Sequence, residues 1–206
     1  MSKVFVIGLD VSTSIVGVTI CDENENILYM GNINFSKCTG LWEKADFFKD
    51  SFIKIYTSYI HDSINKDPDT KVYCVIEEAF SKFASGRSTA HTIGILTQFN
   101  GIVSYICQLF LKERGHKDSL QYINVTHARK LCGIKILRKH PRKLNAKLQV
   151  FEYMMEHDLK DRVSEMKTKK VRGESTLVYP TCAYDMVDSY VIAKAFCRDL
   201  KTKNTL

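Results

Sequence analysis

The chain has 206 residues, 45% of them hydrophobic, and a net charge of +7. This length suffices for one sizeable core and is short for two, so we predict a single domain over 1–206. No run of about 20 consecutive apolar residues or signal-peptide pattern is visible, so we expect no membrane association and a cytoplasmic location. Seven cysteines without a C-x-x-C pair indicate reduced, mostly buried thiols rather than disulfides or a zinc site.

The positive charge is concentrated in one part of the chain. Residues 127–172 contain fourteen Lys or Arg and five Asp or Glu, a net charge of +9, whereas the other 160 residues carry −2. A concentrated basic surface favours a polyanion held by its backbone, because each neutralised phosphate releases counterions. A solvated basic surface without a partner is the alternative.

The N-terminal third predicts three short strands followed by a helix. Val- and Ile-rich runs at 3–9, 14–21 and 27–35 are separated by turn residues and form a meander. A spacing of three and four residues then predicts an amphipathic helix over 43–66. The run 71–77 has almost no polar interruption, as in a strand buried on both faces. The apolar stripe of the predicted helix consists of Phe48, Phe52, Ile55 and Tyr59.

The rest of the chain alternates helices with one further strand. We predict a long helix over 90–114, in which Gly94 and Gly101 would allow another backbone to approach closely. Thr126 is a candidate cap for a short helix, and Asn145 opens another. The remaining predicted segments are a strand at 121–125, a basic mobile loop at about 160–180 and a last helix at 182–201.

Four carboxylates stand at the ends of these segments. Asp10 ends the first strand and Glu77 the most apolar one, while alternation sends Glu78 to the opposite face from Glu77. Asp185 and Asp188 lie three apart, on one face of the last helix. Taken singly, Asp10 could be a turn former, Glu77 a surface charge, and the pair an acidic helix turn.

Together the four acids predict a metal centre. If the first and fourth strands are neighbours, Asp10 and Glu77 share one edge of the sheet, and the last helix closes over them. Four clustered carboxylates cannot all stay ionised without a cation. Their hard oxygens suit Mg²⁺ or Mn²⁺, and two such ions about 4 Å apart can activate water and stabilise a leaving oxygen in phosphodiester cleavage.

The same segments resemble RuvC-type Holliday junction resolvases of the RNase H-like superfamily. VIGLDVSTSIVGVTI is similar to the family's opening strand–Asp–turn–strand, and VIEEAF to its second motif, with Glu77 as metal ligand and Phe80 as the following aromatic. YDMVDSYVIAKAF resembles the C-terminal DxxD helix, and NAKLQVFEYM the preceding basic stretch, which carries over Lys147. The matches occur in the family's order along nearly the whole chain.

The resemblance implies a fold and an activity. The fold would be an RNase H-like α/β domain, with a mixed five-stranded sheet of a three-strand meander and two parallel strands, and helices on both faces. The activity would be resolution of four-way DNA junctions by paired symmetric nicks that leave 5′-phosphates and 3′-hydroxyls. Two Mg²⁺ ions, or Mn²⁺, would bind per site, and the protein would be a homodimer, with helix 90–114 as a possible interface. The long segment 160–180 and the extra Phe83 are compatible with a phage or viral branch, whose members would act in the host cytoplasm.

Aromatic and basic side chains near the predicted centre are candidates for DNA contacts. In the loop after Glu77, aromatic rings that could stack on exposed bases alternate with cations, and further cations lie in the basic third. Lys147 is favoured because it lies in the first turn of its helix, where backbone amides also attract anions. The candidate DNA-binding residues are Phe80, Lys82, Phe83, Arg87, Lys139, Arg142, Lys143 and Lys147.

Three other functions stay open. The opening strand, Asp and Ser/Thr turn also occur in sugar kinases and actin-like ATPases, but those proteins need a second similar domain and a later glycine-rich phosphate loop. A non-catalytic junction-binding module would have no need of all four acids. A nuclease of broader range would also cut flaps and forks.

Overall fold

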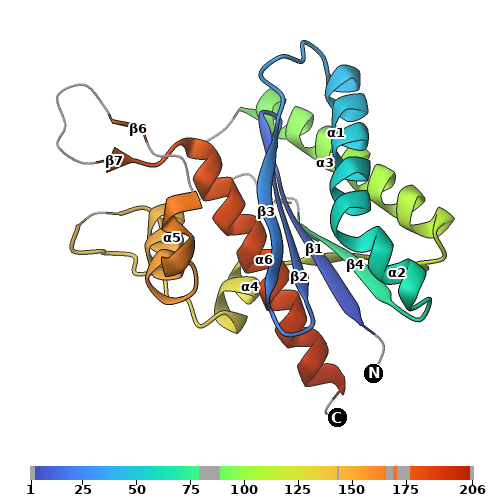
Figure 1. Ribbon diagram of the computed structural model, residues 1–206. Coiled ribbons are helices and arrows are strands. Elements are labelled where there is room, and N and C mark those ends of the chain that lie inside the picture. The colour runs from blue at the N-terminus through green and yellow to red at the C-terminus, as the bar shows by residue number, and fades with distance from the viewer. Residues whose placement is uncertain (1–2, 79–88, 143, 166–168, 171–176, 205–206) are drawn as a thin grey trace.

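The computed structural model describes residues 3–78, 89–142, 144–165, 169–170 and 177–204. A central sheet has the strand order β3-β2-β1-β4-β5 (Figure 1). Its antiparallel pairs are β1–β2 and β2–β3, and its parallel pairs are β1–β4 and β4–β5. The predicted combination of a three-strand meander with two parallel strands is confirmed. The strands are β1 (Val4–Val11), β2 (Ile15–Asp22), β3 (Ile27–Asn34), β4 (Lys71–Glu77) and β5 (Leu120–Ile123).

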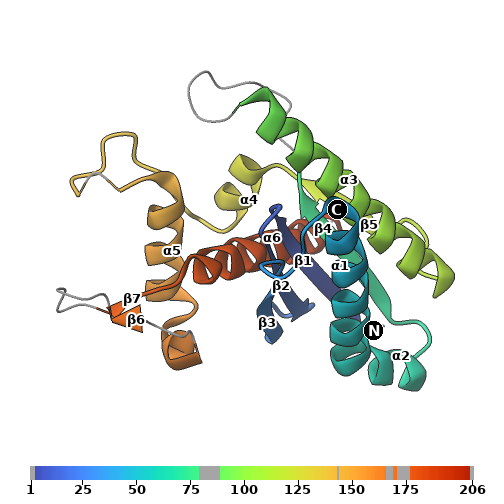
Figure 2. The same ribbon diagram turned by 90° about the horizontal axis from the view of Figure 1, so that it is seen from above.

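Helices cover both faces of the sheet (Figure 2). On one face lie α1 (Leu41–Tyr56) and α3 (Ala90–Glu113). On the other lie α4 (Val125–Leu131), α5 (Ala146–His157) and α6 (Thr181–Asn204). The last of these packs along β1 and β2.

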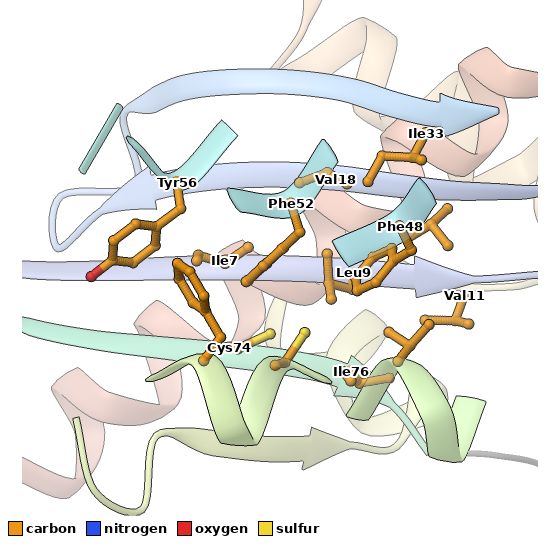
Figure 3. Close-up of a cluster of buried hydrophobic side chains, with 14 of the residues drawn as sticks. Ile7, Leu9, Val11, Val18, Ile33, Phe48, Phe52, Tyr56, Cys74 and Ile76 are labelled. Atoms are coloured by element: carbon orange, nitrogen blue, oxygen red, sulfur yellow. The ribbon is translucent and has the colours of Figure 1, made fainter. Parts of the chain in front are cut away.

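Side-chain alternation along β1 divides the core into two apolar clusters. Ile7 and Leu9 point toward α1, where they meet Phe48 and Phe52 (Figure 3). Val6, one residue out of phase, belongs to the cluster under α6. Because the two faces are both covered, β1 and β4 carry almost continuous apolar sequence, as predicted for central strands.

The first helix is interrupted by a wide turn that the sequence pattern did not predict. After α1 the chain forms a π-helix, η1 (Thr57–His61), and then α2 (Asp62–Lys66). The buried stripe continues from Phe52 through Tyr56 and Ile60, at spacings of four, rather than through Ile55 and Tyr59. A four-residue spacing drifts out of phase with 3.6 residues per turn, and the wider π turn returns Ile60 to the core.

Two local expectations need correction or extension. The cap of α4 is Asn124, not Thr126, since the Asn124 side chain accepts hydrogen bonds from the backbone N–H groups of Thr126 and His127. The helix expected to open at Pro141 and Asn145 begins directly after Asn145, whose side chain caps α5. Within the expected loop 160–180 the chain forms a short 3₁₀ helix, η2 (Lys160–Glu165), and a two-stranded ribbon. The strands of this ribbon are β6 (Lys169–Lys170) and β7 (Leu177–Val178).

By length and hydropathy alone, α3 is one helix that could cross a membrane, although no apolar run in the sequence suggested it. Residues on one side of it, including Phe99 and Val103, pack in the core against the sheet, and core helices pass the same test. No atom of the described residues lies within 4 Å of a Cβ built at Gly94 or Gly101. The close helix contact predicted for these glycines is therefore not made in this part of the chain.

Candidate metal centre

Asp10 and Glu77 stand side by side at the carboxyl edge of the sheet. Strands β1 and β4 pair in parallel through Leu9 and Ile76, which directly precede the two acids. By the alternation of side chains along a strand, Asp10 lies on the same face of the sheet as Val6, and Glu77 on the same face as Val75. Both valines belong to the apolar cluster under α6. The two carboxylates therefore project toward α6, as expected.

Glu78, the acid that follows Glu77, is exposed, and its carboxylate accepts a hydrogen bond of 3.4 Å from the Asn124 side chain at the start of α4.

Helix α6 reaches the acids because the strands under it lack side chains at two points. A Cβ at Gly17 would lie 2.0 Å from the backbone oxygen of Asp185, and one at Gly8 would lie 2.3 Å from that of Ser189. Such contacts are possible only for glycine. The Thr19 hydroxyl on β2 also lies 2.8 Å from the Ser189 hydroxyl. These contacts fix the depth and position of the helix turn that carries Asp185 and Asp188.

Lys147 completes the group from α5. Its ammonium nitrogen lies 2.5 Å from Oδ1 of Asp185 and 3.6 Å from Oδ2 of Asp188. The side chains of Asp185 and Asp188 are 13% and 18% exposed, whereas that of Lys147 is 45% exposed. The lysine therefore lies on the solvent side of the acids.

Asp10 interacts electrostatically with the three other carboxylates. Burial, followed by the charge of Asp188, raises the pKa of Asp10 well above its usual value; Lys147 opposes this, and Glu77 and Asp185 add to it. Burial and Asp188 raise the pKa of Glu77 to about 7. Burial also raises the pKa of Asp188 to about 6, against the attraction of Lys147 and Arg129. The centre thus has more negative charge than its cations neutralise.

The side chains of Asp10, Glu77, Asp185 and Asp188 have the chemistry of ligands for a divalent metal ion. The donors are buried carboxylate oxygens short of positive charge, which suits a hard cation such as Mg²⁺. In the conformation described, no three His, Cys, Asp or Glu side chains of the described residues are already grouped closely enough to hold an ion. The nearest cation to Asp185 and Asp188 is the Lys147 ammonium itself.

Arg129 is a part of the site that sequence reasoning missed. It lies on α4, and its positive charge lowers the pKa of both Glu77 and Asp188. It also lines a hollow of about 390 Å³ together with Lys130 and Lys135. The sequence could have indicated Arg129 by its position, because it lies in the basic third of the chain, shortly after β5, the strand that pairs with β4.

The other predicted DNA-binding residues are only partly described. Lys139 is exposed, and Arg142 is exposed and paired with Glu152 on α5. The structure thus brings Lys147, but neither Lys139 nor Arg142, into contact with the acids. Outside the described residues lie Phe80, Lys82, Phe83, Arg87 and Lys143.

Comparison with known proteins defines the fold. No protein-family model and no curated protein sequence matches the chain. Two solved structures of Thermus thermophilus RuvC do match, one of them "in complex with Holliday junction substrate". Both structures match with a TM-score of 0.51, and each match covers 97% of this chain and 96% of the RuvC chain. The sequence identity is 11% to the RuvC of the complex and 12% to the RuvC of the other structure. The chain therefore has a RuvC-like fold, with its buried carboxylates at the carboxyl edge of the sheet.

Proposed function

We propose that this protein is a metal-dependent endonuclease that resolves four-way DNA junctions by paired symmetric nicks. The observation that carries the proposal is the arrangement of four carboxylates at one sheet edge of a RuvC-like fold, where Asp10 interacts electrostatically with Glu77, Asp185 and Asp188. The junction as substrate is supported by the structural neighbour that was solved with one.

Each side chain has a distinct task in this proposal. Asp10, which interacts electrostatically with the three other acids, would together with Glu77, Asp185 and Asp188 hold the two Mg²⁺ or Mn²⁺ ions. The ions would supply an activated water and neutralise the leaving 3′-oxygen, leaving a 5′-phosphate. Lys147 and Arg129, next to the acids, would hold the non-bridging oxygens of nearby phosphates.

Cutting two related strands requires two centres, so the proposal includes a homodimer. The exposed aromatic residues Trp42 and Tyr105, on α1 and α3, support these helices as the interface. They are 74% and 66% exposed and line a common groove of about 830 Å³. Apolar surface of this kind on a described face favours a partner.

A panel of labelled DNA substrates tests the proposal. The full-length protein is incubated with a four-way junction, a flap, a fork and a plain duplex, with Mg²⁺ or with EDTA. We expect symmetric 5′-phosphorylated nicks in the junction alone, and only with Mg²⁺. Equal cutting of flaps and forks would replace this function with that of a broader branched-DNA nuclease. Binding without cutting would favour a non-catalytic module. A separate assay with ATP and Mg²⁺ tests the remaining alternative, since ATP hydrolysis would favour an actin-like enzyme.

A further inference from the structure

Lys147 occupies the place where positive charge is most needed in the metal-free centre. It is the second residue of α5, whose first turn is fixed by a hydrogen bond of 2.9 Å from the Leu148 N–H to the Asn145 side chain. From there its ammonium reaches Asp185 and Asp188, which lie nearly forty residues further along the chain on another helix. Two helices are thus joined by an ion pair whose acidic partners are also the proposed metal ligands.

The ion pair is strong enough to hold the acids and accessible enough to be released. Burial alone would lower the pKa of Lys147, but the hydrogen bond to Asp185 and the charges of Asp10, Asp185 and Asp188 raise it. The side chain is nevertheless nearly half exposed, and a lysine ammonium is a compact charge on a flexible stem. It can therefore swing toward solvent without any movement of the backbone.

We propose that Lys147 is an exchangeable counter-ion. In the metal-free protein it holds Asp185 and Asp188 together, and it gives up these carboxylate oxygens when a divalent cation binds them. This inference rests on the proposed function, because it concerns the same centre. The released ammonium then neutralises a phosphate of the bound DNA backbone, so that metal binding and substrate binding share one side chain.

The physical reason is competition for the same oxygen atoms. The Lys147 ammonium and a metal ion would both be drawn to Oδ1 of Asp185, and two cations this close repel each other. Arg129 on α4 differs from Lys147, because its effect on Glu77 and Asp188 is that of a nearby positive charge, which lowers the pKa of both acids.

Magnesium binding to Lys147→Met tests the exchange without reference to catalysis. Isothermal titration of the EDTA-treated full chain with Mg²⁺ is expected to give about tenfold tighter binding for this variant, since one tenfold step corresponds to about 1.4 kcal/mol, close to the lower end for a hydrogen bond to a charged group. Its Tm in EDTA is expected to fall, and the rise in Tm on adding Mg²⁺ to exceed that of the wild type. A merely structural lysine would lower both Tm values equally.

Two further variants serve as controls. Lys203→Met removes a lysine of α6 that pairs with Asp199 at 2.7 Å and lies about 22 Å along the helix axis from Asp188, so it should leave Mg²⁺ affinity unchanged. Lys147→Arg keeps the charge and should keep wild-type affinity. If the methionine variant does not fold, amine labelling of the wild type replaces it: Mg²⁺ should increase acetylation of Lys147 at least threefold, as read by mass spectrometry, and leave Lys203 unchanged.

The outcomes separate this inference from the function on which it rests. Magnesium binding that is unchanged or weaker in Lys147→Met, or labelling of Lys147 that is insensitive to Mg²⁺, overturns the exchange and leaves the nuclease proposal standing. Absence of any Mg²⁺ or Mn²⁺ binding to the wild type overturns both.

Discussion

The Thr19 hydroxyl on β2 and the Ser189 hydroxyl on α6 form a buried hydrogen bond of 2.8 Å, and Ser189 directly follows the proposed ligand Asp188. The Ser189 hydroxyl also donates to the backbone oxygen of Met186, one turn earlier. This polar contact lies in an otherwise apolar interface between sheet and helix. It fixes the position of α6 along β2, and with it the position of two carboxylates relative to Asp10.

Replacement of Thr19 by Val keeps the shape of the side chain and removes its hydroxyl. We expect the free energy of unfolding to fall by about 1–2 kcal/mol, because a buried hydrogen bond is lost. Urea unfolding of Thr19→Val, Ser189→Ala and the double variant measures the coupling between the two residues. Strictly additive losses would show that the pair does not act as a unit.

Replacement of Gly17 by Ala places a methyl group against the backbone oxygen of Asp185. The contact would be 2.0 Å, so α6 must shift; we expect a loss of about 1–3 kcal/mol in stability and, for a shift of about 1 Å, about 100-fold slower cleavage. Gly94→Ala is the matched control, since no described atom outside its own helix backbone and chain neighbours lies within 4 Å of a Cβ there, and alanine favours helix. Equal activity in both variants would contradict the role given to Gly17.

The pattern of apolar runs and acids was enough to predict the strands, the helix order and the strand ends that carry Asp10 and Glu77, whereas the parallel pairing within one mixed sheet was expected from the resemblance. These features depend on local periodicity, which the sequence shows directly. The contact between Lys147 and Asp185 was not predicted, because it depends on how α5 packs against α6. The role of Gly8 and Gly17 was also missed, although glycine inside a strand often indicates a close backbone approach. Tyr59 was predicted on the buried stripe, but the structure exposes it and buries Ile60 instead, because the π turn at Thr57–His61 changes the phase of the helix.

The stability of the metal-free protein should depend on pH through the acids of the centre. The folded pKa of Glu77 is about 7 and that of Asp188 about 6, against ordinary values of 4.5 and 3.8. Above the ordinary values the folded state therefore binds more protons than the unfolded state. The contribution of Glu77 and Asp188 to the free energy of unfolding is therefore fully present below about pH 4. It is lost as the pH rises through the pKa values that the two acids have in the folded state.

We therefore expect the decline in Tm between pH 5 and 8, measured in EDTA, to be smaller in Glu77→Gln than in the wild type. The lowered pKa of His116, caused by burial and by Arg114, gives a slope of opposite sign in both proteins, so the difference between them isolates Glu77. Parallel Tm curves would show that Glu77 does not titrate in this range.

Removal of the positive charge of Arg129 should make the acids harder to ionise. Burial is the main cause of the raised pKa values of Glu77 and Asp188, and Arg129 opposes it in both. In Arg129→Gln the pH profile of junction cleavage at limiting Mg²⁺ should move to higher pH, with cleavage at pH 6 about 3- to 10-fold slower. Lys130→Gln, one residue and about 100° away around the helix, is the control. A uniform loss of rate at every pH would instead indicate a loss of DNA binding.

The most direct test of the metal centre is the substitution Asp10→Asn, which removes the charge of the carboxylate that interacts with all three others. Cleavage of a labelled four-way junction in Mg²⁺ is compared with binding of the same junction in Ca²⁺ by gel shift, for the wild type and the variant. We predict that cleavage falls by at least about 1,000-fold, as for loss of a central electrostatic group, while the affinity for the junction changes less than about threefold. Retention of junction cutting by Asp10→Asn would contradict the account.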